Sequence, residues 1–155
     1  MGRDYLRTLL AGAAGLGVNF LLLGLADRMG IVTARGGFQR LAKLWAAPPL
    51  RALGIDRTWA ALHLPDPGGP VFVNGFKIGV GLAMAVIYLW IRPTLPGPPL
   101  AKGLTYALLI WLINAAIVLP ALGEGFAGID TLSLAGILAF AGAHTAFFIV
   151  LALLS

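Results

Sequence analysis

Four apolar runs, each about as long as a bilayer is thick, constrain this chain more than any other feature of its sequence. They are residues 5–26, 71–91, 103–122 and 132–154. A helix needs about 20 apolar residues to cross the hydrocarbon core of a membrane. The sequence therefore predicts an all-α integral membrane protein with four transmembrane helices and a long amphipathic first loop at 27–70.

The composition supports the same class of protein. Hydrophobic residues make up 59% of the 155 residues and charged residues only 11%, whereas a soluble domain carries about 25% charged residues. The whole chain, 1–155, is therefore expected to form one membrane domain. Arg3 and Arg7 followed by an apolar run resemble the start of a signal peptide. Because the run is long and ends without a good cleavage site, we expect an uncleaved first helix.

The excess of positive charge, a net +5, points to lipid as a partner. The basic residues flank the apolar runs or lie in the first loop, so anionic head groups explain them better than nucleic acid does. They occur on both sides of the expected bundle. Because the first helix often sets the orientation of a membrane protein, we expect both termini in the cytoplasm. The absence of cysteine excludes disulfides, thiolate metal sites and covalently bound c-type haem.

Glycines are concentrated in the first two apolar runs. Gly12 and Gly15 lie in the first, and Gly75 and Gly79 form a GxxxG pair in the second. Small residues let helix backbones approach closely in lipid, where packing replaces the hydrophobic effect. We therefore expect these four glycines to lie at helix–helix interfaces.

The first loop contains an amphipathic helical pattern. Its apolar positions are Phe38, Leu41, Leu44 and Trp45. Pro48-Pro49 is expected to end this piece, and a second short piece is expected around Trp59. Basic amphipathic helices with tryptophan usually lie flat at the head groups. Trp45, Trp59 and Trp90 are therefore predicted to be interfacial anchors.

Polar side chains inside the apolar runs are the main candidates for a functional site. They are Asn19, Asn74, Lys77, Asn114 and His144. At 1.5 Å per helical residue, Asn19, Lys77 and Asn114 lie about 9–12 Å from the same membrane face. One hypothesis is a shared polar site around Lys77, with Asp27 or Glu124 as its counter-ion. The other is that the asparagines bond between helices and the lysine snorkels to the surface.

His144 is the most deeply placed titratable residue, at about 20 Å from that face. It could bind haem or a pigment, or relay protons. The second histidine, His63, lies in the loop, so a haem held by two histidines of one chain is not expected. The alternative is a packing hydrogen bond to Thr105, Tyr106 or another chain.

Catalytic constellations are absent from the sequence. Glu124 is the only glutamate, and Ser133 and Ser155 are the only serines. No paired carboxylates within one span, metal-ligand cluster, nucleophile–base pair or phosphate-binding loop can be recognised. We therefore predict that the protein is not an enzyme and has no metal site, and we predict no cofactor beyond the haem or pigment that His144 could hold.

A stretch in and after the third apolar run resembles a known family. The matching segments are Gly103-Leu104-Thr105-Tyr106-Ala107-Leu108, Trp111-Leu112, Val118-Leu119-Pro120 and Gly123-Glu124-Gly125-Phe126. They are similar to a family of small bacterial four-helix inner-membrane proteins of unknown function, whose last helix carries a histidine, matched by His144. The family tends to have a histidine near the start of its second helix, where this chain has Asn74-Gly75-Phe76-Lys77. The resemblance implies a bacterial inner membrane.

These observations support three functional hypotheses. The leading one is a non-catalytic accessory subunit of a larger membrane complex, most plausibly a respiratory or photosynthetic electron-transfer assembly. Its partners would be other membrane subunits and lipids. The alternative is a small oligomeric transporter or channel with a polar site around Lys77. The third is a haem- or pigment-binding subunit that uses His144.

Overall fold

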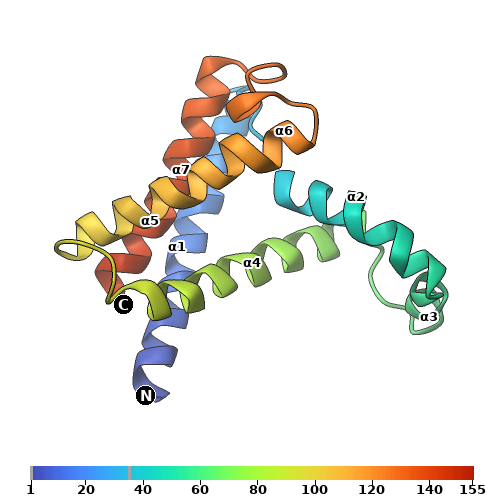
Figure 1. The fold of residues 1–155 in the computed structure, drawn as a ribbon, viewed down its shortest axis with the longest axis horizontal. Helices are drawn as coiled ribbons and strands as arrows, with labels where there is room; N and C mark the ends of the chain where they lie inside the picture. The colour runs from blue at the N-terminus through green and yellow to red at the C-terminus, as the bar shows by residue number, and fades with distance from the viewer. Residues whose placement is uncertain (1, 35) are drawn as a thin grey trace.

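The computed structural model describes residues 2–34 and 36–155, and four of its helices are long and apolar enough to cross a membrane (Figure 1). They are α1 (Gly2–Arg28), α4 (Pro70–Ile91), α5 with its extension (Pro99–Ala121) and α7 (Leu134–Leu154). No strand occurs in the described ranges. The predicted all-helical class and the four candidate spans are confirmed, each within a few residues of its expected bounds. Both ends of the chain lie at the same end of the bundle.

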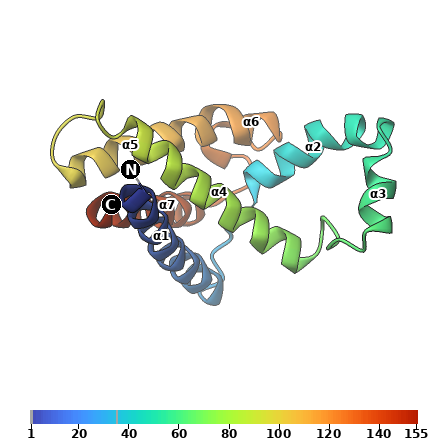
Figure 2. The same ribbon diagram turned by 90° about the horizontal axis from the view of Figure 1, so that it is seen from below.

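Helices α1 and α7 lie side by side and antiparallel, and the other two long helices pack on this pair. Helix α5 (Pro99–Ile113) packs along α7, and α4 crosses α1 (Figures 1 and 2). Near the termini, Arg7 Nε donates a hydrogen bond of 2.8 Å to the Leu154 carbonyl. The core centres on Tyr88, Tyr106 and Leu151, which are almost fully buried.

Glycines allow the close approach of α1 to its two neighbours. A Cβ on Gly12 would lie 2.7 Å from the Cβ of Ala85 in α4, and one on Gly15 would lie 2.8 Å from the Phe147 carbonyl oxygen in α7. Only glycine fits without displacing these atoms. By contrast, a Cβ on Gly75 or Gly79 would meet no described atom within 4 Å. The described chain therefore does not provide the interface expected for this glycine pair.

Helices α4 and α5 touch near the short link that joins them. The rings of Tyr88 and Tyr106 stack with centroids 5.6 Å apart, and Tyr106 Oη donates to the Met84 carbonyl over 3.2 Å. Lys102 Nζ donates to the Arg92 carbonyl over 2.7 Å. From there the two helices diverge (Figures 1 and 2). The two helices therefore contact each other at one end only, because α4 packs on α1 and α5 packs on α7.

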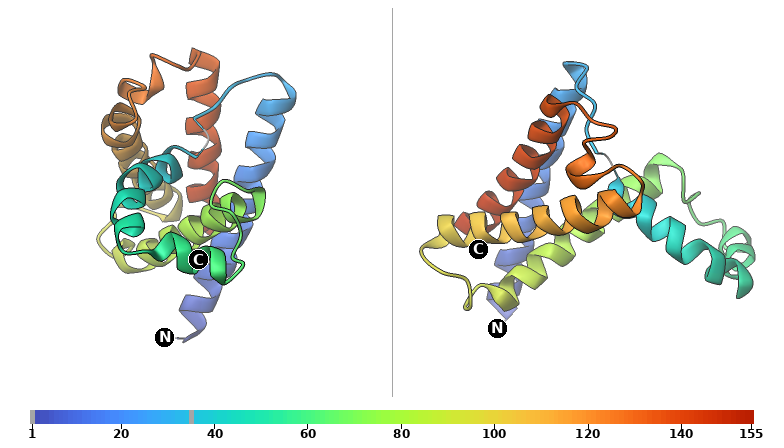
Figure 3. Two further views of the ribbon diagram at one scale, coloured as in Figure 1. Left: turned by 90° about the vertical axis from the view of Figure 1, so that its right-hand side faces the viewer. Right: turned by 45° about the horizontal axis from the view of Figure 1, so that its top comes forward.

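The first loop forms an arm of two helices that projects beside the bundle (Figure 3, right). They are α2 (Gly37–Ala52) and α3 (Ile55–Ala61). The prediction that Pro48-Pro49 ends the first piece is wrong, since α2 continues through both prolines. Proline has no backbone N–H, so the helical hydrogen bonds to the carbonyls four residues earlier are missing. These carbonyls belong to Leu44 and Trp45, which are exposed residues. The break falls instead at Gly54, whose φ of 70° is costly for other residues.

Candidate functional site

A cavity of about 260 Å³, which we call the central cavity, lies among the four long helices and the start of α2. Its polar lining residues are Asn19, Gln39, Lys77, Asn114 and His144. Asn19, Lys77 and Asn114, which the sequence predicts at one depth in the membrane, come from three different spans and all line the cavity. Helix α7 adds the imidazole of His144. Asn74 is not on its wall. The role of these side chains stays a prediction.

The rest of the cavity wall is apolar and rich in aromatic rings. Its phenylalanines are Phe20, Phe38, Phe76, Phe140, Phe147 and Phe148. Phe38 of α2 meets Phe76 of α4 with ring centroids 6.0 Å apart, and Phe147 lies edge-on to Phe148 at 4.8 Å. A cavity of this kind, apolar with a few converging polar groups, is typical of small-molecule sites. The aromatic lining is not predictable from any one stretch of the sequence, since these rings come from four separate segments.

Asn19 brings a side-chain amide to this wall. The residue is only 7% exposed. Its amide forms no hydrogen bond with any residue in the described ranges and borders the cavity. Among the described residues, the fully buried side-chain oxygens without a partner belong to Thr8 and Thr33, so the Asn19 amide is open to the cavity. The amide is therefore available to a polar group that enters the cavity.

Asn114 lies where the third span changes its helical register. A π-helix occupies Asn114–Val118, and the amide of Leu119 bonds to the Asn114 carbonyl five residues back. The Asn114 side chain donates through Nδ2 to the Ile110 carbonyl over 3.2 Å. Pro120, in the short α6 (Leu119–Ala121), has no amide hydrogen to continue the α-helical pattern. Single π-turns inside α-helices occur frequently at functional sites, and this one borders the central cavity.

The imidazole of His144 has a defined orientation. Its Nδ1 lies 2.8 Å from the Phe140 carbonyl, one turn back in α7. A carbonyl only accepts, so Nδ1 carries the proton, and in the neutral ring Nε2 is left as an acceptor or a ligand. In the described chain the ring bonds to its own helix rather than to Thr105 or Tyr106, and Tyr106 donates to Met84. A bond from His144 to another chain stays a prediction. His144 thus borders the cavity with one nitrogen already used by its own helix.

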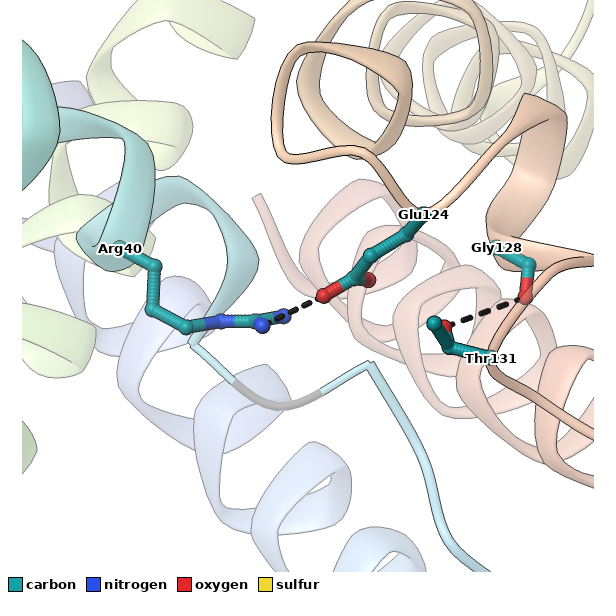
Figure 4. A network of polar contacts seen from close by, with 4 residues as sticks. All are labelled: Arg40, Glu124, Gly128 and Thr131. Carbon is teal, nitrogen blue, oxygen red and sulfur yellow. Dashed lines mark hydrogen bonds and ion pairs between the residues drawn. The ribbon is translucent and has the colours of Figure 1, made fainter.

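The ion pair that Glu124 makes in the described structure is with Arg40 rather than with Lys77. Arg40 Nη1 lies 2.5 Å from Glu124 Oε1 (Figure 4). The hypothesis that Glu124 neutralises Lys77 is therefore replaced by a link between α2 and the loop after α6. Asp27 lies in the last turn of α1 and is not on the cavity wall.

The start of α2 closes one side of the central cavity. Gly36, Gly37, Phe38 and Gln39 all line it. A Cβ on Gly37 would lie 3.4 Å from a methyl of Leu119, so α2 packs tightly on α6 at this point. Gln39 is buried, although the loop around it is polar in sequence. Sequence reasoning missed Gln39 because no apolar run contains it.

The tryptophans predicted to be interfacial anchors differ in their surroundings. Trp45 is 64% exposed on α2. Trp59 donates through Nε1 to the Pro65 carbonyl over 2.9 Å, and Trp90 donates to the Tyr5 hydroxyl over 3.0 Å. Exposed rings with a polar edge suit the head-group region, and their role as anchors stays a prediction.

Neither a metal site nor a known relative indicates the function of this chain. Among the described residues, no three histidine, aspartate or glutamate side chains are grouped in a way that could hold a metal ion. No family model, curated protein or solved structure matches this chain. The resemblance to the four-helix inner-membrane family therefore remains an expectation from the sequence.

Proposed function

We propose that this protein is a non-catalytic membrane protein whose central cavity binds a small lipophilic ligand with a polar group. One observation carries the proposal: the Asn19 amide borders the cavity and forms no hydrogen bond with a described residue. A ligand with a polar group would give that amide a partner. The apolar wall would hold the remainder of the ligand.

The volume agrees with a ligand that is only partly enclosed. Pockets that enclose drug-sized molecules measure about 300–1,000 Å³, and the central cavity measures about 260 Å³. It therefore has room for the polar head of a lipophile, with a longer tail left in the surrounding lipid.

The test is to identify what the protein carries. Protein purified in a mild detergent is extracted with organic solvent, and the extract is analysed by mass spectrometry. Val80→Phe, at the cavity wall, fills part of the space, and Asn74→Leu on the same helix is the matched control. We expect a lipophile in stoichiometric amount with the parent and the control, and less with Val80→Phe. Equal amounts in all three would overturn the proposal.

Transport through the same cavity is a second candidate function. The observation that favours it is the π-helix at Asn114–Val118, because π-turns within helices occur frequently at functional sites. Lys77, on the cavity wall, would be the charge on the pathway. Flux of a labelled ligand into liposomes should fall with Lys77→Met and persist with Asn74→Leu. If the protein only binds the ligand, the parent and both variants should show no flux.

A role as an accessory subunit of an electron-transfer complex is also proposed, together with its membrane location. It is supported by the Gly75–Gly79 face, which the described chain leaves uncovered and which a helix of another subunit could occupy. The α2–α3 arm, with exposed Trp45 and basic residues such as Lys43, would lie on anionic lipid. We place the protein in the bacterial cytoplasmic membrane with both termini inside. Co-purification with electron-transfer subunits from native membranes tests this role.

A further inference from the structure

The polar groups of the central cavity include amides, which can donate and accept, and one imidazole nitrogen whose role is fixed. The Asn19 amide can donate, whereas His144 Nε2 can only accept while Nδ1–H is held by the Phe140 carbonyl. A ligand head with an oxygen that accepts and a hydroxyl or N–H that donates can bond to both. A head that only accepts, such as a carboxylate or a quinone, bonds to the amide alone and leaves His144 Nε2 without a partner.

The shape of the wall favours a ring. Phenylalanines from α1, α2, α4 and α7 surround the space, and Phe140 itself lies against the His144 ring with centroids 4.1 Å apart. Aromatic rings pack well in edge-to-face and offset-stacked geometry at 4.5–7 Å. Linear acyl chains gain nothing specific from such a wall. The lining therefore favours one aromatic or quinonoid ring over an acyl chain.

From these two features, and resting on the proposed function, we propose that the central cavity binds the head of a lipid-soluble quinone and its quinol. A quinone carbonyl accepts from the Asn19 amide. In the quinol, a hydroxyl donates to His144 Nε2. The alkyl or isoprenoid tail extends into lipid. The two forms differ at His144, since only the quinol has a proton to donate there.

The binding experiment compares head groups that share one tail. Decylubiquinone, decylubiquinol, decylbenzene and decanoate are equilibrated with the purified protein in mild detergent, and bound ligand is measured after rapid separation. The variants are Asn19→Leu and His144→Phe, with Asn74→Leu as the control on α4. The melting temperature of each variant is recorded, and Val80→Phe replaces Asn19→Leu if that chain does not fold.

We expect the quinone and the quinol to bind and decylbenzene not to compete. Asn19→Leu should weaken both forms about 3- to 10-fold, the effect of one neutral hydrogen bond. His144→Phe should weaken the quinol at least 3-fold more than the quinone, a ratio that a purely structural defect would not change. Asn74→Leu should leave both affinities unchanged.

Two results would overturn the inference, and they can be told apart. Binding of decanoate that depends on Asn19, without quinone binding, would refute the ligand class and leave the proposed function standing. Failure of every head group to bind in an Asn19-dependent way, with the chain folded, would remove the proposed function as well. An unchanged quinol-to-quinone ratio in His144→Phe would refute the assignment of His144.

Discussion

The guanidinium of Arg40 and the carboxylate of Glu124, 84 residues apart in the chain, form an ion pair of 2.5 Å that joins α2 to the loop following α6 (Figure 4). Arg40 is half exposed, whereas Glu124 is nearly buried. The residues just before Arg40 line the central cavity. This pair therefore fixes the segment that closes one side of the candidate site.

Replacing Glu124 with glutamine should loosen α2. An ion pair with one half-exposed partner contributes about 1 kcal/mol, which corresponds to about a fivefold larger open population. Trypsin cleavage at Lys43 in α2 should therefore be about fivefold faster in Glu124→Gln. Arg51→Met, an exposed arginine on the same helix, is the control and should leave the rate unchanged. A rate equal to that of the parent in Glu124→Gln would show that other contacts hold α2.

Gly12 and Gly17 offer a matched pair on α1. A Cβ on Gly12 would lie 2.7 Å from that of Ala85, whereas one on Gly17 would meet no described atom within 4 Å. Gly12→Ala should therefore cost about 1–3 kcal/mol through overpacking. Gly17→Ala should be neutral or slightly stabilising, because alanine favours helix. Unfolding in mixed detergent micelles measures both, and equal stabilities would mean that α1 and α4 are not in this close contact.

The uncovered glycines of α4 separate packing within the chain from packing against a partner. Gly75→Leu and Gly79→Leu should leave the melting temperature of the isolated protein within about 1 °C, because no described atom lies within 4 Å of either Cβ position. If another subunit packs there, the same changes should reduce its recovery in a pull-down from native membranes. Undiminished recovery with both variants would place the partner elsewhere.

Tyr106 tests the junction of α4 and α5. Its hydroxyl donates to the Met84 carbonyl over 3.2 Å, and its ring stacks on Tyr88. Tyr106→Phe keeps the ring and removes the donor, so the free energy of unfolding should fall by about 0.5–1.5 kcal/mol. Tyr5→Phe is the comparison, because the Tyr5 hydroxyl accepts from Trp90 at an exposed site and should contribute less. A larger loss at Tyr5 would contradict this view of the core.

Local signals in the sequence account for some helix ends. Ser133 is the N-cap of α7 and accepts a bond of 3.2 Å from the Gly136 amide. The same reasoning failed at Pro48-Pro49, where α2 continues. A local signal predicts a helix end well where a capping side chain bonds to a free backbone amide. It predicts poorly where the backbone is exposed, because a proline there removes a hydrogen bond at little cost.

The candidate site was only partly predictable. Depth along each helix brought Asn19, Lys77 and Asn114 to one level, and the cavity wall contains all three. The partner of Glu124 could not be derived, because depth alone does not show which side of a helix faces which neighbour. Nor could the contribution of Gln39 and Phe38 to the cavity wall be derived, because a helical pattern in a long loop does not show where that helix packs against the other spans.

The sequence by itself determined the class of protein: four long apolar helices, their bounds, and a basic amphipathic arm. These features follow from hydrophobicity and length, which act residue by residue. Only the tertiary structure decided that α4 and α5 diverge from their link, that Gly12 and Gly15 are covered while Gly75 and Gly79 are not, and that the start of α2 closes a cavity around Asn19. Those outcomes depend on how side chains from distant segments pack together, and no local pattern contains that information.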